Sequence, residues 1–431
     1  MGVSPFETVS MGNFRVHVCP TEKFKTTTIA AMIQQELTPE TVTKTALLPN
    51  VLQRGTVSYP STLQLKRKLE DLYGATLYTD VFKRGERHIM HVGLEIANGR
   101  YLSESPKLLR EGTAFLMEVL TRPVTEDGGF RRAYVEAEKK NLKQKIDSLL
   151  DDKIRYAAQR CVAEMCDKEP FGLFVYGRTE DLPSIDPDNL YTYYRQVIET
   201  RPIDFFFVGN VSVDEVAALV RELFPYAEGE RPPVEVKREQ PAVDRVKEVV
   251  ERLDVIQGKL NMGCRTGATI RDDDYISLLM YNGILGGFPH SKLFMNVREK
   301  ASLAYYASSR LESHKGILTI QSGIEIANYR KALDIIQKQL DAMRKGDISD
   351  RELSQTRATL SNQLRERQDR PYELIDFAYH SILSGRDWTI DRLLKGIEEV
   401  NKEDVRRVAE RVQLDTIYFL RDKGGTADGA N

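Results

Sequence analysis

The feature that most constrains the fold is a charged, proline-rich stretch that interrupts the chain near its middle. Residues 226–245 read YAEGERPPVEVKREQPAVDR, and their few apolar residues follow neither a helical nor a strand period. Such a composition is typical of a linker. A chain of 431 residues is also too long for one ordinary hydrophobic core. We therefore predict two domains, residues 1–227 and 246–424, joined by a linker at 228–245, and a disordered tail at 425–431.

The two predicted domains repeat one series of patterns. Residues 69–96 and 297–326 each begin with a charged helix end and continue as two runs of alternating β-type residues. In both, an amphipathic helix and then a long charged helix follow. The match is looser at the end, because FFFVGNVSVDEVAALV places a strand before a helix and NKEDVRRVAERVQLDTIYFL has the reverse order. The repetition predicts an α+β fold of two homologous α/β sandwich domains, each an antiparallel sheet packed by helices.

Composition excludes some classes of partner. Lys and Arg total 62 against 64 for Asp and Glu, which gives a net charge of −2 and no electrostatic case for nucleic acid or a membrane surface. No window approaches about 18 uninterrupted apolar residues, and the N-terminus lacks the pattern of a signal peptide. The cysteines have no CxxC spacing, so we predict reduced thiols in a cytoplasmic protein. They are Cys19, Cys161, Cys166 and Cys264.

No histidine or cysteine stands in a catalytic or metal-binding motif. The sequence has six histidines but no HxxEH arrangement, and it lacks GxSxG, P-loop and GxGxxG patterns. His88 and His91 lie in an alternating stretch and face opposite sides of a strand, so they would not chelate one metal together. Cys161 and Cys166 lie on a predicted helix, where a spacing of five residues separates them by about 140°. A thiol-based site is therefore not favoured.

Two glycines and an Arg/Tyr pair remain as candidates for contact with a ligand. Gly286 and Gly287 lie in NGILGGFPHSKLF between two predicted helices, where glycine permits positive φ or a close backbone approach. This pair suits a plain inter-helix turn as well as it suits a peptide contact. Arg298 is predicted to end a helix and Tyr305 to lie in the following strand. They could hydrogen-bond a peptide carbonyl, although the residues alone favour a surface ion pair and a buried aromatic ring.

Together these pieces resemble a known family. The segment LGGFPHSKLFMNVREKASLAYYASS is similar to the signature of the second domain of the M16 metallopeptidases, which include pitrilysin and mitochondrial processing peptidase. VYGRTEDLPSI and FFFVGNVSVDEV resemble segments of the family's first domain. The resemblance implies two homologous domains that form half of a clam-shell. It also implies that Arg298 and Tyr305 hold a substrate backbone, with Gly286 and Gly287 in the adjoining glycine-rich segment.

The zinc motif that the resemblance implies for the first domain is missing. In the family this motif is HFLEHM followed shortly by Gly-Thr, and it supplies two histidine ligands and a glutamate that activates water. The segment TALLPNVLQRGT keeps Gly-Thr at 55–56, which aligns the histidines with Ala46 and Asn50 and the glutamate with Pro49. Alanine and proline offer no donor atom, and asparagine is a poor zinc ligand. Pro49 would also strain a helix interior unless it lies in the first turn.

The third ligand that the resemblance implies is lost as well. The family places two glutamates seven residues apart on a later helix, and the second of them binds zinc. In YVEAEKKNLKQKI these positions correspond to Glu138 and Lys145, which share one helix face. A lysine would repel Zn²⁺. We therefore expect no catalytic residue, no metal and no cofactor in this chain, and we regard Ala46, Pro49, Asn50 and Lys145 as degenerate positions.

These losses predict a catalytically inactive M16-type subunit. The resemblance implies pairing with an HxxEH-bearing homologue, which would hold the zinc, and joint enclosure of a peptide or unfolded protein for proteolysis. The chain also resembles inactive members that stand beside an active paralogue in Gram-positive bacteria, some of which are associated with modification of elongation factor P. A homodimer is a further alternative, because the halves of such proteins are self-complementary in shape. The alternatives are a stand-alone peptide-binding or scaffolding protein and an enzyme with a non-zinc site.

Overall fold

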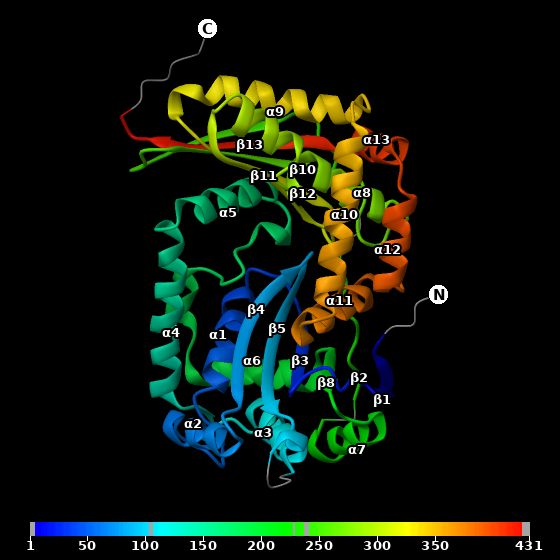
Figure 1. Ribbon diagram of the computed structural model, residues 1–431. Helices are drawn as coiled ribbons and strands as arrows, with labels where there is room; N and C mark the ends of the chain where they lie inside the picture. The colour runs from blue at the N-terminus through cyan, green and yellow to red at the C-terminus, as the bar shows by residue number, and fades with distance from the viewer. Residues whose placement is uncertain (1–4, 103–106, 227–228, 237–240, 425–431) are drawn as a thin grey trace.

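The computed structural model describes most of the chain and arranges it around two sheets, one above the other in Figure 1. The described residues are 5–102, 107–226, 229–236 and 241–424. The predicted tail at 425–431 lies outside this range, as do residues 228 and 237–240 of the predicted linker. Among the described helices, none is both long and apolar enough to cross a membrane.

The first sheet has six strands in the order β1-β2-β8-β3-β5-β4. Its central strands are buried along nearly their whole length, because helices cover both faces of the sheet. The run IDFFFVG is buried at every position, as expected of a strand with two covered faces. The strands are β1 (Glu7–Met11), β2 (Phe14–Pro20), β3 (Thr26–Glu36), β4 (Thr76–Arg84), β5 (Arg87–Ala97) and β8 (Ile203–Gly209).

The second sheet has five strands in the order β11-β12-β10-β13-β9. The outer strand β9 alternates between exposed and half-buried residues, whereas the central strand β10 is buried throughout. The strands are β9 (Lys247–Leu253), β10 (Gly258–Arg265), β11 (Ala304–Glu312), β12 (Ile317–Ile324) and β13 (Gln413–Asp422). A further two-stranded hairpin is formed by β6 (Thr125–Glu126) and β7 (Gly129–Phe130).

The two sheets repeat one topology. In each, a hairpin occupies one edge (β4–β5 and β11–β12), and the last strand of the half inserts between two earlier strands. It pairs parallel with one of them (β8 with β2, β13 with β9) and antiparallel with the other (β8 with β3, β13 with β10). The first sheet has β1 in addition, at its other edge. The sheets are therefore mostly, and not wholly, antiparallel. The looser match at the ends of the halves has a simple cause. A helix, α6 (Pro187–Thr200), precedes β8 just as α13 (Lys402–Arg411) precedes β13, and the helix after β8 is an addition to the first half.

Four helices of the first half cover one face of the first sheet, and their apolar side chains form its main core. These are α1, α3, α6 and α7. On the second sheet the corresponding face is covered by α8, α9 and α13. Apart from α6 and α13, whose bounds are given above, the α-helices of the two halves are α1 (Val42–Leu52), α2 (Thr62–Asp71), α3 (Leu108–Thr121), α4 (Arg132–Asp147), α5 (Lys153–Met165), α7 (Val213–Leu223), α8 (Tyr275–Asn282), α9 (Tyr329–Arg344), α10 (Asp350–Arg367), α11 (Pro371–Ser384) and α12 (Ile390–Glu399).

Each half lends one helix to the other half's sheet. Helix α5 packs Ala157 and Cys161 against Tyr418 and Leu420 of the second sheet. Helix α11 packs Leu374, Ile375, Tyr379 and Leu383 against the face of the first sheet that carries Phe206 and Met32. Figure 1 shows α5 beneath the upper sheet and α11 reaching down to β3 and β8. This exchange fixes the two sheets relative to each other and sets the space between them.

Candidate functional site

The segment that carries three of the degenerate positions, Ala46, Pro49 and Asn50, forms α1. Ala46 is buried, and the side-chain amide of Asn50 donates to the carbonyl of Ala46 at 3.0 Å. Pro49 lies well inside the helix and not in its first turn. Because proline has no N–H, the carbonyl of Thr45 loses its helical partner, yet the helix continues to Leu52 since most of its residues are buried in the core.

The two positions on α4 differ in their surroundings. Glu138 is buried, forms an ion pair with Arg54 and accepts from Nδ2 of Asn141 at 3.1 Å. The ammonium of Lys145 lies 3.8 Å from the centre of the Tyr176 ring and 3.9 Å from a carboxylate oxygen of Asp80. Since α1 packs against both α4 and β4, the structure brings all four degenerate positions to one region of the first half.

These residues do not fit a zinc ion. Ala46 and Pro49 offer no donor atom, Asn50 spends its amide on the helix backbone, and Lys145 brings a positive charge. The surviving carboxylate of Glu138 is already paired with the Arg54 guanidinium. Among the residues described, no group of three or more His, Cys, Asp or Glu side chains could hold a metal ion. No chemical step through zinc follows from this chain's own residues.

In the second half, the glycine pair lies on a π-helical turn, η5 (Gly283–Gly287), that continues α8. A Cβ on Gly286 would lie 2.6 Å from the backbone nitrogen of Ser309, so glycine is required there because β11 crosses so closely. Ser309 also donates through Oγ to Oδ1 of Asn282 at 2.8 Å. Gly287 has more room and faces the cavity described below. Gly286 is thus placed at a packing contact and Gly287 at an open surface.

Arg298 and Tyr305 both lie on irregular backbone. Arg298 is on a second π-helical turn, η6 (Phe294–Lys300), with its guanidinium 4.6 Å from the centre of the Phe294 ring and 3.6 Å from the carboxylate of Glu299. Tyr305 sits where the β11–β12 register shifts, and 68% of its surface is exposed. π-Turns and β-bulges are frequent at functional sites. The exposed ring differs from the buried aromatic that the residues alone suggested.

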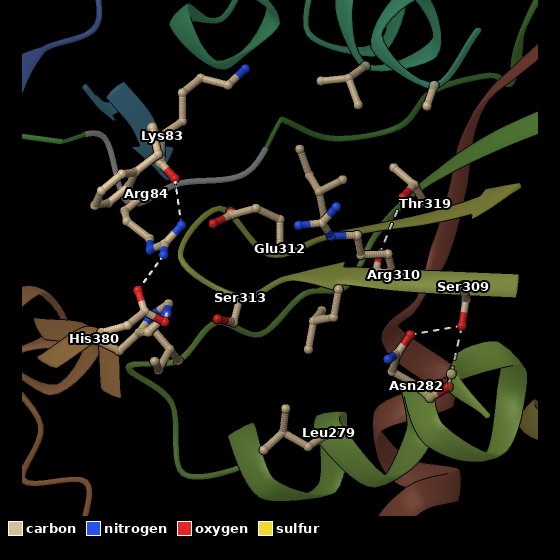
Figure 2. A pocket seen from close by; sticks show the side chains of 18 of the residues that line it. Lys83, Arg84, Leu279, Asn282, Ser309, Arg310, Glu312, Ser313, Thr319 and His380 are labelled. Atoms are coloured by element: carbon tan, nitrogen blue, oxygen red, sulfur yellow. Dashed lines mark hydrogen bonds and ion pairs between the residues drawn. The ribbon is translucent and has the colours of Figure 1, made fainter. Parts of the chain in front are cut away.

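A cavity of about 1050 Å³ lies between the two sheets. Strand β4, the loop at 171–176, α5, the η5 turn, β11, the C-terminal part of α10 and the middle of α11 are among the elements that line it. In Figure 2, Arg310 and Glu312 project from β11 into the space that Lys83 and Arg84 border on the other side. Among the described residues lining the cavity, Gly287 is the one member of the predicted substrate-binding set; Arg298, Tyr305 and Gly286 lie elsewhere.

Sequence reasoning missed the charged side chains at the join between the halves. Arg84 pairs with Asp376 of α11 at 2.5 Å, and the hydrogen bonds that Asp376 makes with His380 and Arg84 outweigh burial, so that its pKa falls below the usual range. His380 also hydrogen-bonds His314 at 2.7 Å, and burial together with neighbouring cations lowers the pKa of His314. Arg84 and His314 lie at hairpin turns, whereas Asp376 and His380 lie on α11, and neither setting indicates in the sequence which partner a residue has.

A second group joins the two hairpins through Lys315. Its ammonium lies 2.5 Å from carboxylate oxygens of both Glu86 and Glu169. Arg265 extends the group, with Nη2 at 2.5 Å from Glu169 and Nε at 2.9 Å from Asp415. All of these side chains are largely buried. The network holds the β4–β5 and β11–β12 turns, which border the cavity, against each other.

The remaining nucleophiles are unsuited to catalysis. All four cysteines are free and buried, and burial raises the pKa of Cys19 to about 11 and that of Cys166 to about 12. Such thiols hold almost no reactive thiolate at neutral pH. His88 and His91 are both buried on β5, and burial lowers their pKa to about 3 and about 4, respectively. The structure therefore gives the non-zinc enzyme no activated group among these residues.

Known proteins resemble this chain over nearly its whole length. Residues 184–360 match the family described as "Peptidase M16 inactive domain". The chain is 42% identical to the "probable inactive metalloprotease YmfF" of Bacillus subtilis (strain 168), over 96% of this chain and 97% of the relative.

Solved structures show the same fold. A conserved protein from Enterococcus faecalis V583 superposes with a TM-score of 0.92 at 32% identity, over 98% of this chain and 100% of that one. The peptidase M16 inactive domain from Pseudomonas fluorescens has a TM-score of 0.80 at 16% identity, over 98% of both chains. The second likeness concerns the fold alone. Together they place both sheets, and not one of them, within the shared architecture.

Proposed function

Because the chain belongs to the M16 peptidase family and is a non-catalytic member of it, we propose that it pairs with a zinc-bearing M16 homologue and helps to enclose a peptide or unfolded protein that the homologue cleaves. The contrast between its halves carries the proposal. The first half has Ala46, Asn50 and Lys145 where zinc ligands would stand, whereas the second half presents Arg298 and Tyr305 on irregular, exposed backbone. Zinc is expected in the partner only.

In this proposal, Arg298 and Tyr305 hold the main chain of the substrate. A guanidinium and a phenol both donate hydrogen bonds, and peptide carbonyls accept them. Arg298 lies over the Phe294 ring and has one ion-pair contact, at 3.6 Å from Glu299, but its side chain is 44% exposed. Tyr305 is mostly exposed, so both side chains are accessible to a ligand. When two such subunits close on each other, this half would position the substrate for the partner's site, and positioning alone contributes strongly to rate.

We also propose that the protein works in the cytoplasm. Its four cysteines are all buried and free of disulfides, which suits a reducing compartment. Fractionation of cells, followed by an antibody against the chain, tests this placement. Recovery with the culture medium or the membrane fraction would contradict it.

Reconstitution tests the pairing. We expect this chain to co-purify with an HxxEH-bearing homologue from the same cell, and peptide cleavage to require both proteins. Arg298→Ala and Tyr305→Phe in this chain should reduce cleavage by the pair about 10-fold, which corresponds to one lost hydrogen bond of about 1.4 kcal/mol. Arg351→Ala and Tyr101→Phe change the same residue types at exposed positions elsewhere and should leave cleavage unchanged. Full cleavage by the homologue alone would refute the proposal.

A stand-alone peptide-binding or scaffolding protein is the second candidate. The observation that favours it is the cavity between the sheets, which this chain forms without a partner. Sedimentation of the purified chain separates a monomer from a homodimer, and isothermal titration with peptides measures binding in the absence of a homologue. Tight peptide binding by a chain that pairs with no homologue would favour this candidate over the first.

A further inference from the structure

The cavity carries more positive than negative charge, although the whole chain is slightly acidic. Arg155 on α5, Arg310 on β11 and Arg367 at the end of α10 line three different walls. Arg155 and Arg310 form no ion pair within 4.0 Å among the described residues, and Arg367 has one long contact, 3.9 Å from Glu373. Such side chains are free to pair with a ligand.

The three carboxylates of the lining are engaged to different degrees. Asp376 is paired with Arg84 and lies 3.4 Å from Nε2 of His380. Glu312 lies near Arg310 on β11 in Figure 2, but it accepts from the backbone nitrogen of Lys315 at 2.6 Å and of Gly85 at 3.4 Å, within the hairpin turns. Asp80 has only loose contacts, 3.4 Å from the Tyr176 hydroxyl and 3.9 Å from the ammonium of Lys145. Five Lys and Arg side chains thus face three carboxylates in the lining, and the net charge of the cavity is positive.

Apolar and aromatic side chains line the cavity together with these arginines. Phe174 and Tyr176 come from the loop after α5, Phe288 follows the η5 turn, and the largely buried Trp388 precedes α12. A narrow space with low-dielectric walls strengthens the field of the charges that line it. Arginine also presents a planar fork that matches a carboxylate. The lining thus complements an extended polypeptide that alternates acidic and apolar side chains.

We propose that this cavity selects acidic polypeptide segments, with Arg155 and Arg310 as the residues that determine the specificity. The inference rests on the proposed function for the polypeptide nature of the ligand and adds the charge that the ligand must carry. The arginines read carboxylates, while the aromatic residues accept the apolar side chains between them. A basic segment is repelled by the same groups.

Fluorescence anisotropy with two labelled peptides tests the selection on the full chain alone. The peptides are unstructured and identical in length and leucine content, one with glutamate and the other with glutamine at the remaining positions. We expect the glutamate peptide to bind about 10-fold more tightly, and added salt to remove most of this difference. Arg155→Gln and Arg310→Gln should each weaken binding of the glutamate peptide about 3-fold and leave the glutamine peptide unchanged.

The control is Arg132→Gln, which removes the same charge from an exposed residue at the start of α4, outside the cavity. It should change neither affinity. Equal affinity for both peptides, or equal weakening of both by Arg155→Gln and Arg310→Gln, would overturn the charge selection while leaving the proposed pairing intact. Binding of neither peptide would overturn it as well. Failure of the chain to pair with a homologue would not affect this measurement, so the two proposals are tested separately.

Discussion

Replacement of Lys315 should lower the free energy of unfolding more than the loss of a lysine on the surface does, because Lys315 joins the two halves of the molecule. In Lys315→Met, the carboxylates of Glu86 and Glu169 lose a cation at 2.5 Å. Glu169 keeps Arg265, whereas Lys315 is the one cation that pairs with Glu86 among the described residues. The loss of one partner from a buried pair costs about 3–5 kcal/mol of folding free energy. Because Arg265 still pairs with Glu169 in the variant, we expect a cost of about 3 kcal/mol.

A double-mutant cycle separates this pairing from simple loss of packing. Glu86→Gln removes the charge and keeps an acceptor for Lys315, so it should cost about 1–2 kcal/mol. The double variant leaves neither charge buried, and we expect it to be more stable than the sum of the single effects predicts, by about 1 kcal/mol or more. Urea unfolding measures all four proteins. The single tryptophan, Trp388, is buried in the second core and lines the cavity, so its fluorescence reports on this region.

The stability difference between wild type and Lys315→Met depends on pH in a direction that follows from the pKa shifts. Burial alone lowers the pKa of Lys315, but hydrogen bonds with Glu169 and Glu86 outweigh it and raise the pKa, so the lysine's contribution persists up to its ordinary titration and is lost above it. Burial alone raises the pKa of Glu169, but Arg265 and Lys315 outweigh it and lower the pKa, so its contribution is lost only as the pH falls below the ordinary range of glutamate. The stability difference between wild type and Lys315→Met should therefore be constant from about pH 5 to about pH 10.

The control is Lys395→Met, which removes an exposed lysine 3.7 Å from Glu399 and should cost no more than about 0.5 kcal/mol. Additive effects in the cycle, or a cost for Lys315→Met as small as that of Lys395→Met, would refute the view that a buried ion network joins the halves.

Three further outcomes follow from local geometry. Gly286→Ala should destabilise by about 1–3 kcal/mol, because its Cβ would meet the backbone of β11, whereas Gly287→Ala meets only the side chain and carbonyl of Asn282 at 3.2 Å and should cost much less; equal costs in thermal unfolding would contradict this. Pro49→Ala should stabilise the protein by about 1 kcal/mol, because the gain in helix propensity, about 3 kcal/mol, exceeds the cost of losing about two buried methylenes, about 1.6 kcal/mol. A fall in the urea midpoint would contradict this. Cys166 should resist iodoacetamide at pH 8 until the chain unfolds, and rapid alkylation of the native protein, detected by mass spectrometry, would contradict its raised pKa.

The sequence alone allowed the fold class to be predicted, because strand and helix periods repeat in both halves and local hydrophobic pattern determines them. It did not reveal the exchange of α5 and α11, since an amphipathic helix indicates that one face is buried and not which sheet covers it. Nor did it reveal the pair Glu86–Lys315, whose members are 229 residues apart in the chain. The degenerate positions on α1 were predicted from Gly55 and Thr56, which keep the register of the family's motif, and Lys145 was predicted from its spacing to Glu138. The cavity's arginines have no motif of their own.

Glu138 shows how a buried carboxylate on α4 is neutralised by side chains of the chain itself. A carboxylate in such a position needs a compensating cation. Arg54, just before the Gly-Thr turn that keeps the register, provides it through an ion pair, and Asn141 fills a further hydrogen bond. Zinc ligands introduced at Ala46, Asn50 and Lys145 would therefore bring Zn²⁺ into the region of a guanidinium that already neutralises Glu138. Ala46 and Pro49 are thus held by packing in the core, and the nearby buried carboxylate of Glu138 is held by ion pairing.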